Sequence, residues 1–112
     1  MSLHHASSGE KIDVRSLGEK LTQTTSTALL RTADLEVMRI VLPKGKSIPE
    51  HHVPGEITIQ CIEGTVELQA HGANQILMAG EMLYLEGNMP YAIFALENAS
   101  VLMTILRKAD GG

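Results

Sequence analysis

The sequence predicts an all-β fold, an antiparallel sandwich or small barrel built from short strands. Runs of alternating apolar and polar residues recur along the chain, separated by turn residues about every eight to twelve positions. No long amphipathic helical pattern interrupts them, and the short links between runs favour hairpins and therefore antiparallel pairing. The chain has 112 residues, which suits one domain.

Each expected strand follows from the alternation of its own residues. In the run 35–42, Met38, Ile40 and Leu42 share one face, which we assign to the core. Pro43 ends this strand because it has no N–H to donate to a neighbouring strand. The run 65–70 alternates strictly, so Val66 and Leu68 are also expected inside. The other expected strands are residues 28–31, 57–62, 75–78, 82–85, 92–96 and 100–107.

The expected strands divide the chain into three parts. Residues 1–24 are expected to form an N-terminal arm that is partly disordered and lays an extended piece or one helical turn over the barrel. Residues 25–107 form the β-barrel, and residues 108–112 form a disordered tail.

The composition argues against several classes of protein. The net charge is −4 and Lys and Arg are not clustered, so neither nucleic acid nor a membrane surface is expected as partner. No segment approaches ~18 consecutive apolar residues, and residues 1–10 do not resemble a signal peptide. The single cysteine, Cys61, cannot form an internal disulfide and fits a reducing compartment, so we expect a cytoplasmic protein. No pattern of nucleophilic hydrolysis or nucleotide binding is present.

The stretch GKSIPEHHVPGEITIQCIEG, residues 45–64, contains the most distinctive chemistry. Two adjacent imidazoles, His51 and His52, come just before an alternating strand, so we expect them at one end of a barrel. Strand parity places Cys61 on the same face as His51, whereas Gln60 lies on the other face with His52. Glu63, beside the closing glycine, is expected to be a solvated turn residue.

These residues resemble the two motifs of the cupin family, whose members are double-sheet jelly-roll barrels. Gly45 is followed by five residues and then His51, and this first motif closes at Gly64. The second motif opens at Gly80 and continues through EMLYLEGNMPYAIFA to Ala95. The resemblance covers about residues 25–107 and implies an antiparallel double-stranded β-helix.

The resemblance also implies a degenerate metal site. Metal-binding cupins use two histidines and a glutamate of the first motif and a histidine of the second. In this chain the glutamate position falls on Ile57, and Glu56 comes one residue early, which turns its side chain to the opposite face. The second histidine position falls on His52 or Val53, and Tyr91 replaces the histidine of the second motif.

Two imidazoles therefore remain for a metal, His51 and His52. A third ligand would have to be Glu56, Gln60 or Cys61, and a bulge would have to rearrange the strand for Glu56 or Gln60 to reach them. One divalent ion, of iron, manganese, nickel, copper or zinc, is the cofactor that this set would hold, and the other interpretation of the site needs none.

Two functions agree with these residues. The first is binding of an unidentified small, partly hydrophobic molecule in a pocket inside the barrel. Its lining would include His51, Ile57, Ile59, Cys61, Met82, Tyr91 and Phe94, with Met38, Ile40 and Met103 among the other apolar candidates. The alternative is a metal-dependent isomerase or dioxygenase that uses His51 and His52. In either case His51 and Tyr91 are the candidate catalytic residues, and no substrate follows from the sequence.

Structural roles are the alternatives for the same residues. His51 then stabilises the barrel rim, His52 lies exposed at a strand edge, Cys61 is an inert core residue, and the Tyr91 hydroxyl bonds to backbone. The family resemblance also implies a homodimer, for which we expect residues 22–31 to supply the paired edge.

Overall fold

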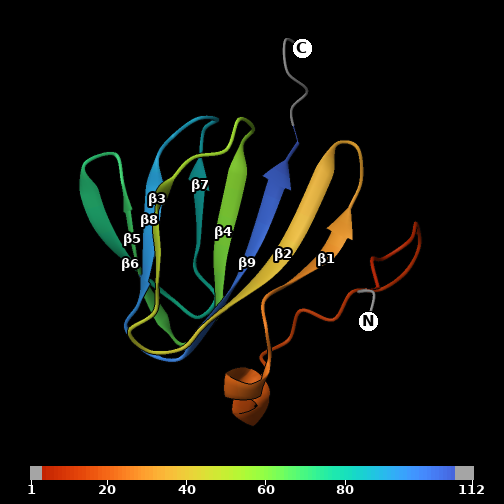
Figure 1. The fold of residues 1–112 in the computed structure, drawn as a ribbon, viewed down its shortest axis with the longest axis horizontal. Helices are drawn as coiled ribbons and strands as arrows, with labels where there is room; N and C mark the ends of the chain where they lie inside the picture. The colour runs from red at the N-terminus through yellow and green to blue at the C-terminus, as the bar shows by residue number, and fades with distance from the viewer. Residues whose placement is uncertain (1–3, 108–112) are drawn as a thin grey trace.

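In the computed structural model, which describes residues 4–107, two antiparallel β-sheets face each other around one core (Figure 1). Residues 1–3 and the expected disordered tail, 108–112, lie outside the described residues. The described elements are a 3₁₀ helix, η1 (Gly18–Gln23), and the strands β1 (Thr27–Arg31), β2 (Leu35–Leu42), β3 (Ser47–His51), β4 (Ile57–Glu63), β5 (Thr65–Ala70), β6 (Ala73–Met78), β7 (Met82–Leu85), β8 (Tyr91–Ala95) and β9 (Ala99–Leu106).

The strand order confirms the predicted antiparallel jelly roll. One sheet has the order β1-β2-β9-β4-β7 and the other has the order β3-β8-β5-β6. Both sheets therefore contain strands from distant parts of the sequence, and β9 lies between β2 and β4 with antiparallel pairing on both sides. The described helix, η1, lies in the N-terminal arm, outside the two sheets (Figure 1).

Strand alternation decides which side chains enter the core. In β4, Ile57, Ile59 and Cys61 are at most 2% exposed, and in β5, Val66 and Leu68 are at most 1% exposed. These strands follow the period of two that the sequence predicted. Side chains from both sheets, including Ile93, Val101 and Met103, join the same hydrophobic cluster.

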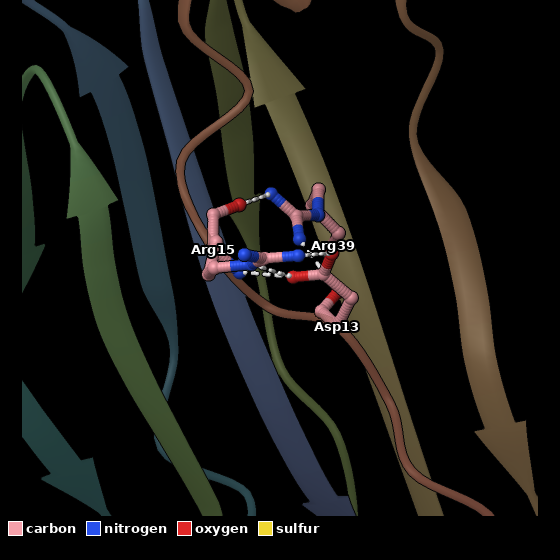
Figure 2. Close-up of polar contacts among 3 residues, drawn as sticks. All are labelled: Asp13, Arg15 and Arg39. Carbon is pink, nitrogen blue, oxygen red and sulfur yellow. Dashed lines mark hydrogen bonds and ion pairs between the residues drawn. The ribbon is translucent and has the colours of Figure 1, made fainter.

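The other face of β2 is also buried, because the N-terminal arm crosses it. Arg39 lies on this outer face and is only 5% exposed. Its guanidinium donates hydrogen bonds to the backbone carbonyls of Arg15 (2.8 Å) and Asp13 (3.0 Å), as Figure 2 shows. The arm residues Asp13 and Arg15 form an exposed ion pair beside it. Arg39, whose side chain lies on the outer face of β2, therefore fastens the arm to the sheet.

Glu63 is a second attachment point for the arm. Its carboxylate accepts hydrogen bonds from the backbone N–H groups of Leu17 (2.9 Å) and Gly18 (3.0 Å) and from the Ser100 hydroxyl (2.6 Å). Burial acts to raise the pKa of Glu63, but these hydrogen bonds and the charge of Arg39 outweigh it and lower the pKa below its ordinary value. The expectation of a solvated turn residue was wrong, because the arm folds back onto this turn.

Within residues 4–107, helical structure is too short and too polar to cross a bilayer.

We predict that Arg39→Ala will lower the free energy of unfolding by about 2–3 kcal/mol, because two charge-assisted hydrogen bonds and a buried aliphatic stem are lost. Urea denaturation followed by circular dichroism measures this change. Arg31→Ala is the matched control, since Arg31 is exposed at the end of β1 and should change stability by less than about 0.5 kcal/mol. Equal losses in the two variants would contradict the anchoring role.

Candidate functional site

The end of β3 and the start of β8 bring His51 and Tyr91 together. The two residues are register partners, and the Tyr91 hydroxyl lies 3.1 Å from Nε2 of His51. Their ring centroids are 4.7 Å apart, with the planes inclined at 49°. Tyr91 is 1% exposed, whereas His51 is solvent-exposed. The pair therefore forms a polar contact between the core and the solvent at one end of the barrel.

Hydrogen bonding fixes the roles of both groups. Nδ1 of His51 lies 3.0 Å from the Pro49 carbonyl oxygen, which can only accept. The neutral imidazole therefore carries its proton on Nδ1, and Nε2 accepts a hydrogen bond from the Tyr91 hydroxyl. Burial raises the pKa of Tyr91 to about 12, so its hydroxyl remains protonated and keeps this donor role at neutral pH.

Two loops hold this pair in place, residues 52–56 before β4 and residues 86–90 before β8. The Asn88 N–H donates to the Val53 carbonyl at 2.8 Å. Asn88 has a positive φ of 63°, a conformation that asparagine tolerates better than most residues. A Cβ atom on Gly87 would lie 2.3 Å from the Pro54 carbonyl oxygen. The loops thus pack backbone against backbone.

Gly55 extends the same contact to the end of β9. An added Cβ at this position would lie 1.7 Å from the Leu106 carbonyl oxygen, and the Leu106 N–H donates to the Glu56 carbonyl at 2.9 Å. No side chain fits between these backbones. Glycine is therefore required at position 55 for close approach of the chain to the end of the barrel.

The other residues expected at the site separate into two groups. Ile57, Ile59 and Cys61 lie between the sheets, together with Tyr91, in the hydrophobic cluster. The Cys61 thiol donates weakly to the Glu63 and Gly64 carbonyls, at 3.4 and 3.5 Å. Burial raises the pKa of this thiol, so it is neutral rather than a metal-binding thiolate.

Met82 and Phe94 do not line the interior, contrary to the expectation. Met82 is 61% exposed and Phe94 is 38% exposed. In β7 the inward positions are Leu83 and Leu85, and in β8 the inward positions alternate from Tyr91, which leaves Met82 and Phe94 on the outer faces. Both strands are apolar on both faces, which conceals their orientation in the sequence.

The expected third metal ligands are not gathered around the two histidines. Glu56 accepts a hydrogen bond from the Tyr84 hydroxyl, and Tyr84 is 57% exposed on the outer face of β7. Gln60 is the register partner of Met82, so it lies on that same outer face. Over residues 4–107, no three His, Cys, Asp or Glu side chains are grouped so as to hold a metal ion. With the ring nitrogens of His51 already engaged, the donor set does not fit a cupin metal centre.

Sequence reasoning missed several polar residues that organise this region. Arg39 and Glu63 fasten the arm, and Tyr84 holds the side chain of Glu56. Only the mismatch of a charged residue within an apolar strand, as for Arg39 in LEVMRIVL, gave a signal in the sequence.

Substitution of Gly55 tests whether the loops position the pair. We predict that Gly55→Ala will lower the free energy of unfolding by about 1–3 kcal/mol, because the Leu106 backbone must move away from the new methyl group. It should also shift the side-chain NMR signals of His51. Ala73→Ser is the control, since Ala73 is exposed at the start of β6 and its substitution should change neither stability nor the His51 signals appreciably. Unchanged His51 signals in a destabilised Gly55→Ala protein would contradict the positioning role.

Comparison with known proteins gives the family. No curated protein matches the chain. Among solved structures, a conserved protein of unknown function from Streptococcus pyogenes is 20% identical with a TM-score of 0.74, covering 97% of this chain and 99% of that one. An RmlC-like cupin from Shewanella frigidimarina is 16% identical with a TM-score of 0.72, covering 97% and 95%. A cupin superfamily protein from Desulfitobacterium hafniense is 17% identical with a TM-score of 0.72, covering 74% and 76%.

At these identities the structural likeness establishes the fold, and the sequence match establishes membership. The model of the family described as Cupin domain matches residues 38–106, more than half of the chain and including both motif regions. The chain therefore belongs to the cupin domain family.

Proposed function

We propose that this cupin binds a small, partly hydrophobic molecule at the end of the barrel where His51 lies. The observation that supports the proposal is the His51–Tyr91 hydrogen bond, which holds an exposed imidazole on a buried phenol. Among residues 4–107, Tyr91 is the only buried aromatic residue, and its hydroxyl is hydrogen-bonded to this one titratable side chain. A ligand that approaches this end of the barrel from solvent therefore contacts the imidazole before it reaches the core.

The surroundings of His51 favour an apolar ligand that carries a weak acid. Val53 and Met89 are partly buried in the two loops and pack against the core, which provides an apolar surface beside the imidazole. A carboxylate is attracted by the positive charge of a protonated imidazole, and no proton has to pass from the ligand to the ring. The imidazole of His51 and the apolar loop residues together favour a ligand that has a carboxylate at one end and an apolar part at the other.

The proposal places the ligand at the end of the barrel rather than deep inside it. Ile59 and Cys61 are 0% exposed and belong to one packed cluster. A guest at their depth would have to displace core side chains, at a cost of about 1–3 kcal/mol or more. Contact with His51 requires no such rearrangement.

Titration with benzoate and hexanoate tests the proposal. We expect either acid to shift the ¹⁵N signals of the His51 ring in a saturable manner, whereas benzyl alcohol and hexanol, which lack the carboxylate, shift them less. His51→Ala should abolish the response of the backbone amides in both loops. His71→Asn, which removes an exposed imidazole from a turn with a positive φ of 53°, should leave it unchanged.

His51→Ala also leaves the buried Tyr91 hydroxyl without its partner, which costs about 1–3 kcal/mol. Tyr91→Phe combined with His51→Ala removes this penalty and shows whether binding or folding has been lost. Absence of any saturable shift with both acids, or a shift that persists in a folded His51→Ala protein, would refute the proposed site.

We also propose that the protein forms a homodimer through residues 22–31. The topology supports this proposal, because β1 is the outer strand of the five-stranded sheet and has one edge without a paired strand. The Ala6 N–H donates to the Leu29 carbonyl at 3.0 Å and covers part of that edge. Edge strands of this type readily pair with a second chain.

Light scattering at micromolar concentration should give the mass of two chains. Leu29→Pro should reduce it to the mass of one chain, because proline removes an N–H that points to the open edge while remaining compatible with an edge strand. Proline at the exposed position Lys11, which lies outside residues 22–31, serves as the control. A monomer at every concentration tested would refute the dimer.

A further inference from the structure

We propose a second binding site, for a neutral oligosaccharide, on the outer face of the four-stranded sheet. A hollow of about 420 Å³ lies over β3, β8 and β5, and its lining includes Ser47, Pro49, Glu67, Gln69 and Phe94. These side chains are on the side of the sheet that faces away from the core. Neither His51 nor Tyr91 is among its lining residues.

Strand register creates this hollow. Phe94 is the register partner of both Ser47 and Glu67, so these three residues form one row across the sheet. The next row on this face lies two residues further along each strand. In it, Ala92 pairs with Gln69, and Gln69 pairs with Asn74. Ala92 is the small residue of this second row, and its methyl group leaves a depression between the Phe94 ring and the longer side chains around it.

A second hollow continues the first toward the β5–β6 turn. It has a volume of about 380 Å³, shares Gln69 with the first and is also lined by Glu50, Asn74 and Pro90. The shared residue makes the two hollows neighbours on one surface. Together they form a groove longer than either hollow, which suits an extended ligand of several units rather than a single small molecule.

The groove contains the groups that recognise sugars. The amides of Gln69 and Asn74 and the carboxylate of Glu67 are planar, and each can bond to two adjacent hydroxyl groups at once. In the described part of the chain these three side chains form no hydrogen bond with another residue, so all their polar atoms are available to a ligand. The exposed ring of Phe94 offers a flat apolar surface to the C–H face of a sugar ring.

The charge of the groove selects among saccharides. Glu67 and Glu50 are the titratable groups of the two linings, apart from the imidazole of His71 at the turn. Two carboxylates repel an anionic sugar, and no Lys or Arg lines either hollow to offset them. A neutral oligosaccharide is therefore favoured over a uronic acid polymer.

Titration of the ¹⁵N-labelled full-length protein with tetrasaccharides tests the site. The probes are cellotetraose, maltotetraose, xylotetraose and chitotetraose, with tetragalacturonate as the anionic comparison. We expect at least one neutral probe to give saturable shifts of the β5 and β8 backbone amides, and tetragalacturonate to give weaker ones. Phe94→Ala and Gln69→Ala should each weaken binding by about tenfold.

Two controls separate this site from other surfaces. Met82→Ala removes an apolar side chain that is more exposed than Phe94 from the outer face of the other sheet and should leave affinity unchanged. The ring signals of His51 should not shift with the tetrasaccharides, which distinguishes failure here from failure of the proposed carboxylic acid site. The proposal would be overturned by absence of binding by all four neutral probes, by wild-type affinity in Phe94→Ala and Gln69→Ala, or by tighter binding of tetragalacturonate.

Discussion

Contact between the two loops at one end of the barrel is the constraint on which the site depends. Gly55 and Gly87 allow backbone to approach backbone where a Cβ atom would meet a carbonyl oxygen, at 1.7 and 2.3 Å. The Asn88–Val53 hydrogen bond joins the same loops. One loop follows His51 and the other precedes Tyr91, so the contact holds the two partners from opposite sides. The hydrogen bond between them is a consequence of this backbone packing.

The N-terminal arm shows a different use of polar groups. Arg39 donates to two backbone carbonyls, and Glu63 accepts from two backbone N–H groups. Each charge is therefore stabilised by main-chain dipoles rather than by an opposite charge in direct contact. Backbone partners do not depend on which side chains the arm carries. The arm can therefore be held in place even though its own ion pair, Asp13–Arg15, is exposed and contributes little.

Most of the fold was predictable from the sequence, because alternation and turn residues are local signals. The inward positions of β4 and β5 follow directly from them. The orientations of Met82 and Phe94 were not predictable, because their strands, MLYL and YAIFA, are apolar on both faces. Only pairing with neighbouring strands decides which face points inward. The role of Glu63 was not predictable either, because it depends on contact with a segment 45 or more positions earlier in the chain.

The replacement of the motif histidine by Tyr91 explains why the site needs no ion to satisfy its donors and acceptors. Two imidazoles facing one another would both present lone pairs, and a cation would hold them together. A phenol supplies a proton instead, and burial keeps that proton in place by raising the pKa of Tyr91 to about 12. Nε2 of His51 accepts it, while Nδ1 donates to the Pro49 carbonyl. Neutral hydrogen bonds thus occupy the positions where this family's motif would direct ligands at a metal, and in the proposed function the ligand contacts the exposed face of His51.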